Sequence, residues 1–168
     1  MQQDQFTIDH LRDLGFIGFV PLAGLPKGCR SLPAEPGVYV VVCDPASTHG
    51  YLDRSVGGRF KGQDGTVDVP TLIDAWVPGP DCLYIGQTTT RLRSRVDSLV
   101  AYGRGEPVGH RGGRYLWQLQ QHGELLVAWR VNDDPIRAER ELLDAFEARY
   151  GRLPFANLVR GRRELVAA

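Results

Sequence analysis

The sequence lacks three features that would assign it to a membrane, secreted or metal-cluster class. It has no continuous apolar run of the ~18–20 residues that a membrane-spanning helix requires, and residues 1–13 contain no basic stretch followed by an apolar one, so no secretory signal is expected. Cysteine is scarce, because Cys29, Cys43 and Cys82 are the only three and form no CxxC or Cys/His cluster. We therefore expect a cytoplasmic protein without disulfides or structural zinc. In this interpretation Cys43 and Cys82 are small buried hydrophobic residues.

Net charge is also absent, since 20 basic residues balance 20 acidic ones. This balance argues against strong non-specific binding of nucleic acid over a broad surface. The distribution is nevertheless uneven, and residues 91–114 contain six arginines against Asp97 and Glu106. A local basic stripe on a neutral protein permits phosphate contacts at one place. The alternative interpretation is a solvated, arginine-rich helix face.

The length and the hydrophobic patterning predict one α+β domain over residues 1–168. Its core is a small antiparallel sheet of about three strands flanked by helices. We expect a long N-terminal arm or loop, an insertion between the first two strands and a basic tail, at residues 1–35, 44–80 and 158–168. The predicted strands are 37–43, 82–86 and 124–131. The predicted helices are 7–14, 69–77, 90–103, 114–123 and 135–150, with Thr88–Thr90 capping the third.

Two tyrosines lie in the first two predicted strands, within "PGVYVVV" and "CLYIG". Adjacent antiparallel strands can bring the phenols of Tyr39 and Tyr84 to one end of a sheet. The alternative is that both are ordinary core aromatic residues.

Three glutamates of the last predicted helix are candidate ligands of a cation. Glu139 is in phase with Leu142, Leu143 and Phe146, which places it on the apolar, inward face, whereas Glu141 points toward solvent. A carboxylate on an inward face is unfavourable to bury unless a partner such as a divalent cation pairs with it. Glu139 is the preferred candidate, ahead of Glu141 and Glu147, and the alternative is an ordinary acid of the helix surface.

These elements, together with an arginine on the helix after "YIG" and an asparagine in "PFANL", resemble the GIY-YIG nuclease family from Gly37 to Asn157. The resemblance implies that Tyr39 takes a proton from the attacking water, with Tyr84 beside it. In the family the catalytic arginine directly precedes an apolar residue, as in "SRV", and this pattern selects Arg95 as the residue that would stabilise charge on the phosphodiester. It implies that Glu139 is the sole protein ligand of one Mg²⁺ or Mn²⁺, with Glu141 as the fallback. Asn157 would hydrogen-bond the site or a backbone phosphate, or would serve as a turn residue.

The sequence also departs from the family pattern. Leu99 stands where many members have a histidine or tyrosine, Gln87 replaces a lysine after "YIG", and the gap between the two motifs is several times longer than usual. Tyr102, or His110 in the glycine-rich "GHRGG", could substitute as a catalytic residue. The residues expected to contact nucleic acid are Gly86, Gln87, Arg91, Arg93, Lys61, Arg111 and Arg114.

The resemblance therefore implies a metal-dependent endonuclease that hydrolyses phosphodiester bonds, in DNA more than in RNA. We expect no membrane partner, and specificity would come from the insertion, the arm, the tail, a protein partner or a second copy of the chain. One alternative is a catalytically impaired protein of the same fold that binds nucleic acid or protein. Another is an unrelated small α+β binding domain whose motifs are coincidental.

Overall fold

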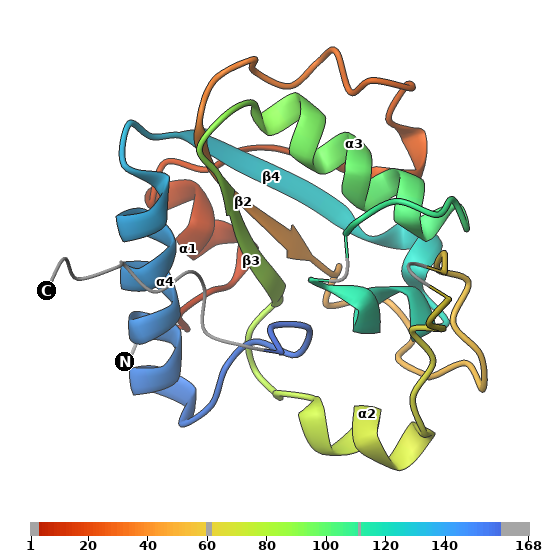
Figure 1. Cartoon of the computed structure of the whole chain (residues 1–168). Helices are drawn as coiled ribbons and strands as arrows, with labels where there is room; N and C mark the ends of the chain where they lie inside the picture. Colours follow the sequence, from red (N-terminus) through yellow and green to blue (C-terminus); the bar gives the residue numbers. More distant parts are fainter. Residues whose placement is uncertain (1–3, 60–61, 111, 159–168) are drawn as a thin grey trace, which may run out of the picture.

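The computed structural model describes residues 4–59, 62–110 and 112–158, which form an α+β fold around a four-stranded antiparallel sheet (Figure 1). The strands lie in the order β1-β4-β2-β3. Their bounds are Ile17–Pro21 for β1, Gly37–Val42 for β2, Cys82–Thr88 for β3 and Leu126–Val131 for β4. β2 is central and every residue in it is buried, in agreement with its almost continuous run of apolar residues.

The sheet has one strand more than the sequence predicts. β1 lies within residues that the sequence indicated as an extended arm. It pairs with β4 through a bulge between Gly18 and Val20, and it ends at Pro21. A short edge strand with a glycine, a bulge and a proline lacks the alternating pattern that identifies longer strands.

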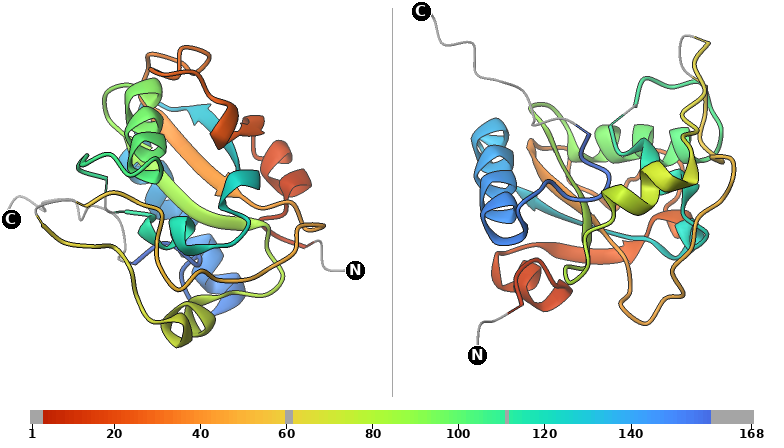
Figure 2. Two further views of the ribbon diagram at one scale, coloured as in Figure 1. Left: turned by 90° about the vertical axis from the view of Figure 1, so that its right-hand side faces the viewer. Right: turned by 90° about the horizontal axis from the view of Figure 1, so that it is seen from below.

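Helices cover both faces of the sheet (Figure 2). α3 (Leu92–Gly103) packs on the face that carries Tyr39 and Val41. The helices α1 (Ile8–Asp13) and α4 (Pro135–Tyr150) pack on the opposite face, which carries Val38 and Val40. Each fully buried valine of β2 contributes about 1.5–3 kcal/mol to folding through removal of apolar surface from water. None of the helices among the described residues is long and apolar enough to cross a membrane.

The ends of α1 and α4 agree with the sequence prediction, whereas the start of α3 does not. Asp134 caps α4 by accepting a hydrogen bond from Arg137 N, and Gly151 ends the helix with a φ of 76°. The N-cap of α3 is Arg91, with no side-chain cap, so the prediction that Thr88–Thr90 cap it was wrong. Backbone carbonyls of residues 33 and 35 accept hydrogen bonds from the first two amides of α3 instead.

The insertion contains the predicted helix, α2 (Val69–Ala75), and is otherwise irregular. Its segments are held by Gln118, whose side-chain nitrogen donates to Leu52 O and Val67 O and whose oxygen accepts from Val67 N. The helix predicted at 114–123 is instead two 3₁₀ turns, η2 (Arg114–Gln118) and η3 (His122–Glu124). The break falls at Leu119, whose backbone is extended and pairs with Tyr51 of the insertion. A third turn, η1 (Leu22–Gly24), follows β1.

All three cysteines are buried and free, as the sequence predicted for Cys43 and Cys82. Burial raises the pKa of the Cys43 and Cys29 thiols to about 11, so both are protonated at neutral pH. Neither thiol is therefore poised to act as a nucleophile.

Candidate functional site

Two neighbouring strands place Tyr39 and Tyr84 on the same face of the sheet. In the β2–β3 register Tyr39 lies opposite Gly86, and Tyr84 lies opposite Val41. The two ring centroids are 6.0 Å apart and the rings are tilted by 51°. A Cβ atom at position 86 would overlap the phenol of Tyr39. The glycine of "YIG" therefore makes the space in which the first tyrosine lies.

His110 contacts this tyrosine pair although it comes from the loop after α3. Its Nε2 atom lies 3.3 Å from the hydroxyl oxygen of Tyr39, and its ring centroid lies 6.5 Å from that of Tyr84. The side chain is fully buried, and among the described residues its Nδ1 atom has no hydrogen-bond partner. Burial, and then the charge of Arg95, lower the pKa of His110 to about 3. His110 is therefore a neutral imidazole throughout the physiological pH range.

Among the described residues, Arg95 supplies a cationic charge that acts on every other member of this cluster. It lies on α3 and is half-buried. Its charge and hydrogen bonding oppose the rise in the pKa of Tyr39 and of Tyr84 that burial causes. The same charge lowers the pKa of His110 and of Glu139. Because burial outweighs Arg95 at both phenols, Tyr39 and Tyr84 have a pKa above the ordinary value and are protonated at neutral pH.

Glu139 reaches the cluster from the other side of the edge strand. It lies on α4, which runs beside β3 (Figure 1), and its side chain is 7% exposed. Burial raises the pKa of this carboxyl to about 7, while the charge of Arg95 lowers it. Its own charge raises the pKa of Tyr84. Within the described part of the chain no hydrogen bond or salt bridge to Glu139 is formed. Glu141, by contrast, is exposed and pairs with Arg137.

Asn157 lies next to the cluster but its amide is engaged with the backbone of β3. Its Oδ1 accepts from Ile85 N and its Nδ2 donates to Ile85 O, both at 2.9 Å. Because β3 is an edge strand, these two bonds satisfy backbone groups that no further strand pairs. Asn157 therefore holds the C-terminal segment against the strand that carries Tyr84.

The residues expected to contact nucleic acid differ in their exposure and in their contacts. Arg91 is exposed, whereas the Nε of Arg93 donates to Leu32 O, and the guanidinium of Arg114 lies 5.9 Å from the ring centroid of Tyr115. Lys61 and Arg111 lie outside the described residues.

Gly86 and Gln87 belong to β3, and Leu99 is fully buried in the core. The Oε1 atom of Gln87 is buried and has no hydrogen-bond partner within residues 4–59, 62–110 and 112–158.

The sequence did not predict the close packing of Gly112 and Gly113 on Tyr84. A Cβ atom at Gly112 would lie 2.6 Å from the Tyr84 hydroxyl, and one at Gly113 would lie 3.5 Å from its ring. Gly113 also has a φ of 77°, a conformation that favours glycine. The two consecutive glycines of "GHRGG" were the available signal for this approach.

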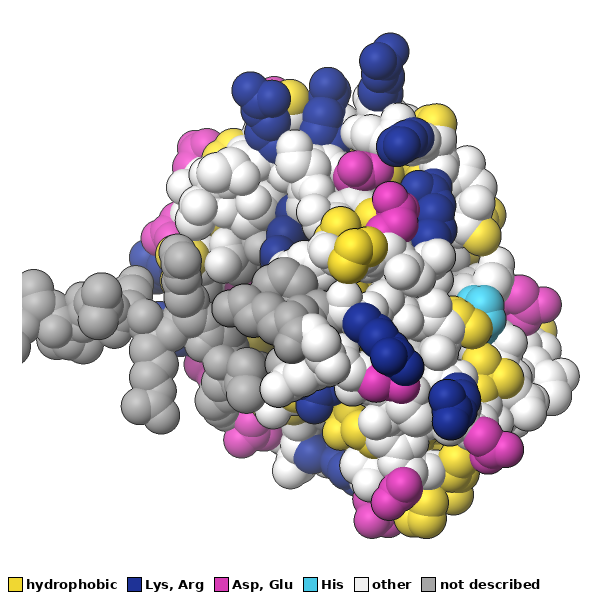
Figure 3. All heavy atoms as spheres, turned by 45° about the vertical axis from the view of Figure 1, so that its right-hand side comes forward, with side chains coloured by type: hydrophobic (Ala, Val, Ile, Leu, Met, Phe, Trp, Pro, Cys, Tyr) yellow, Lys and Arg dark blue, Asp and Glu magenta, His cyan; other side chains and the backbone are white. Residues whose placement is uncertain are grey.

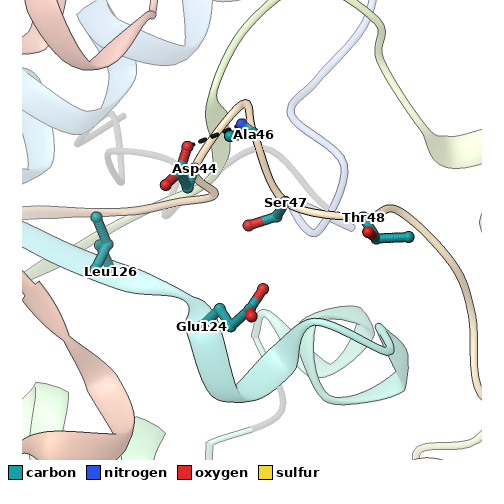
Figure 4. Close-up of a pocket in the computed structure, with 6 residues that line it drawn as sticks. All are labelled: Asp44, Ala46, Ser47, Thr48, Glu124 and Leu126. Carbon is teal, nitrogen blue, oxygen red and sulfur yellow. Dashed lines mark hydrogen bonds between the residues drawn. The ribbon is translucent and has the colours of Figure 1, made fainter.

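A separate cleft of about 440 Å³ lies beyond the end of β2, where Asp44 and Glu124 line it with Ser47, Thr48, Ala46 and Leu126 (Figure 4). None of the cluster residues lines it, and Asp44 accepts a hydrogen bond from Ala46 N. Neither this cleft nor any other part of the described chain contains three or more His, Cys, Asp or Glu side chains arranged to hold a metal ion.

The buried cluster therefore combines two neutral phenols, a neutral imidazole, a guanidinium and a carboxyl that titrates near neutrality. Such a set can bind an anion through Arg95 and can exchange protons among closely packed groups. No protein-family model, no curated protein and no solved structure matches the chain.

Proposed function

We propose that the chain is a metal-dependent endonuclease of the GIY-YIG type that hydrolyses phosphodiester bonds in nucleic acid, with DNA as the substrate. The observation that carries this proposal is the convergence of Tyr39, Tyr84, Arg95, His110 and Glu139, which come from five separate segments, into one electrostatically coupled cluster. A chain with three free, buried cysteines is also consistent with action in the cytoplasm.

Glu139 would hold the divalent cation. The residue suits this role because its carboxyl is buried and, among the described residues, has no hydrogen-bond or salt-bridge partner. A magnesium site often takes only one or two protein carboxylates and completes its shell with waters and substrate phosphate. A bound Mg²⁺ or Mn²⁺ supplies positive charge to the phosphate and to the leaving oxygen.

Arg95 binds and orients the phosphodiester in this proposal. Its guanidinium is half-buried, so its charge is screened less than that of an exposed arginine. A guanidinium can donate two parallel hydrogen bonds to phosphate oxygens. The charge that develops on those oxygens in the transition state strengthens both bonds, and this difference lowers the barrier.

Tyr39 and His110 would together remove the proton from the attacking water. A protonated phenol can accept that proton only if its own hydroxyl proton moves on, and His110 Nε2 lies 3.3 Å away to receive it. In the free protein the lowered pKa of His110 opposes this transfer. A phosphodiester beside Arg95 offsets the arginine charge and so favours the imidazolium. Because burial is the larger cause of the lowered pKa, a bound phosphodiester would remove only the smaller of the two causes that oppose the transfer.

The second candidate function is a catalytically impaired module of the same fold that binds nucleic acid. It is favoured by the pKa shifts of the free protein, because the pKa of Tyr39 is raised and the pKa of His110 is lowered, both away from neutrality. The two candidates share a binding surface and differ only in whether a bond is cut.

Nicking of supercoiled plasmid by the wild type and by Arg95→Gln, Glu139→Gln and Glu141→Gln, in Mg²⁺, Mn²⁺ or EDTA, separates the candidates. We expect metal-dependent nicking that falls at least ~10²-fold in the first two variants. Glu141→Gln is the matched control, because Glu141 is exposed on the same helix, and it should keep wild-type activity.

A wild type that binds DNA but never nicks it would leave only the binding module. Activity that survives Glu139→Gln and is lost in Glu141→Gln would move the cation to Glu141.

A further inference from the structure

Residues 22–35, which we call the strap, are docked along one flank of α3. Gly28 N donates to the carboxylate of Asp97 at 2.8 Å, and the Nε of Arg93 donates to Leu32 O at 3.0 Å. The first two amides of the helix donate to strap carbonyls. In Figure 1 the strap passes over the top of the molecule above α3. These bonds fix the strap to the same helix that carries Arg95.

The strap and α3 together concentrate positive charge on a protein that is neutral as a whole. Of their two carboxylates, Glu35 and Asp97, the second accepts the hydrogen bond from Gly28. Figure 3 shows dark blue side chains gathered along the upper rim, over these two segments. The two segments contain the cationic residues Lys27, Arg30, Arg93 and Arg95, and the two cap residues of α3, Arg91 and Arg104, bring the number to six.

The outer face of α3 separates two cationic flanks. At 3.6 residues per turn, Arg95 falls on the flank away from the strap, and the carbonyl of Arg91, the N-cap residue, accepts a hydrogen bond from Arg95 N. Between the flanks lie Ser94, which is exposed, and Ser98, which is partly exposed. Small uncharged side chains at this ridge let a flat or rod-shaped polyanion approach the helix closely. Arg91 is one turn before Arg95, a rise of about 6 Å along the helix, so a bound chain of phosphates leads into the buried cluster.

We infer that the strap and α3 form a saddle that binds the phosphate backbone of duplex DNA, with Lys27 and Arg30 contacting it on one flank and Arg91 on the other. This inference rests on the proposed function for the identity of its substrate. The strap thus acts as a substrate-positioning element and delivers the backbone to Arg95. Residues that bind phosphates in this way carry no base specificity, so the saddle binds duplexes of any sequence.

The test measures binding of a labelled 20-base-pair duplex by fluorescence anisotropy in EDTA, from 50 to 200 mM KCl. Each lost phosphate contact reduces the slope of log K against log salt by about 0.9, so Lys27→Gln/Arg30→Gln should reduce it by about 1.8 and weaken binding roughly tenfold or more. The KM for cleavage of the same duplex in Mg²⁺ should rise by the same factor.

Arg12→Gln/Arg137→Gln is the matched control. It removes two exposed arginines from α1 and α4, on the opposite face of the sheet, and changes the net charge equally. We expect its salt slope and KM to stay at wild-type values.

The saddle is supported if only the strap variant loses affinity and slope. Equal losses in both variants, or no loss in the strap variant, overturn it, because bulk charge or another surface then binds the DNA. A wild type that binds through the strap but does not cleave upholds the saddle while the proposed nuclease activity fails. If the strap variant cleaves the duplex with the wild-type KM, the nuclease activity stands and the saddle is refuted.

Discussion

Replacement of Glu139 by glutamine tests whether the buried carboxyl of this residue destabilises the fold. The side chain is 7% exposed, and burial raises its pKa from 4.5 to about 7. In the unfolded chain the pKa returns to its ordinary value. The native state therefore binds more protons than the unfolded state between these two values. Stability from this group is complete below pH 4.5 and is lost as pH rises through about 7.

The size of the effect follows from the two pKa values. At 1.36 kcal/mol for each pKa unit, the loss amounts to about 3 kcal/mol once the pH is well above 7. Glutamine has the shape of the protonated acid but does not ionise. We therefore expect Glu139→Gln to match the wild type near pH 4.5 and to exceed its free energy of unfolding by about 3 kcal/mol at pH 8.5.

Urea unfolding of the wild type, Glu139→Gln and Glu141→Gln in EDTA, at intervals from pH 4.5 to 8.5, measures this difference. The control Glu141 is 65% exposed at its side chain and lies 3.0 Å from Arg137 Nε. Its exposed ion pair contributes about 0.2–1 kcal/mol. A Glu139→Gln variant that is no more stable than the wild type at pH 8.5 would refute the argument.

The same measurement with Mg²⁺ or Mn²⁺ separates a cation ligand from a merely buried acid. A cation at ten times its dissociation constant stabilises the wild type by about 1.4 kcal/mol, and it should not stabilise Glu139→Gln. Because the carboxyl must lose its proton to bind the cation, the stabilisation should weaken as pH falls below about 7. An equal metal effect in both proteins would remove Glu139 from the site.

Two further substitutions test how the cluster is positioned. Gly86→Ala should destabilise the protein by about 1–3 kcal/mol and displace Tyr39, because the new Cβ overlaps the phenol. Gly123→Ala meets no atom within 4 Å, so chemical denaturation should show little change for that control. Asn157→Ala should lower the free energy of unfolding by about 1–3 kcal/mol, because it leaves Ile85 N and O unpaired. A loss of nicking without a loss of stability would show instead that Asn157 contacts the phosphate.

Elements with strong local signals were predicted from the sequence. β2 and β3 are runs of β-branched and aromatic residues, and α4 has a capping Asp134, a first-turn proline and Gly151 at its end. β1 was not predicted, because pairing with β4 rather than its own pattern makes it a strand. The prediction of a helix at 114–123 was wrong for a related reason. Its centre at Leu119 bonds to the insertion, and a contact between distant segments overrides local propensity.

The candidate site was predicted where periodicity determines direction. The inward phase of Glu139 on α4 follows from the helical repeat. The shared face of the two strand tyrosines depends in addition on the register of β2 and β3. The contact between His110 and Tyr39 depends on the path of a loop, which no repeat specifies. The strap was missed for a different reason, because backbone carbonyls form most of its bonds to α3 and every residue type has one.

The cluster is difficult to explain as a device for stability. Three of its groups oppose folding relative to apolar residues of the same size. They are a buried carboxyl with a pKa near 7, a half-buried guanidinium, and a neutral imidazole whose Nδ1 has no hydrogen-bond partner in the described part of the chain. At mildly acidic pH the carboxyl is protonated and the histidine is neutral, so among the described members of the cluster it is Arg95 that carries charge. A half-buried cation among neutral donors and acceptors has no counter-anion within the described cluster, and a phosphodiester would supply one. Once that anion is bound, it would offset the charge of Arg95, so that the arginine would repel a divalent cation at Glu139 less strongly. The groups that weaken the free fold are therefore those that a bound phosphate and a bound cation would satisfy together.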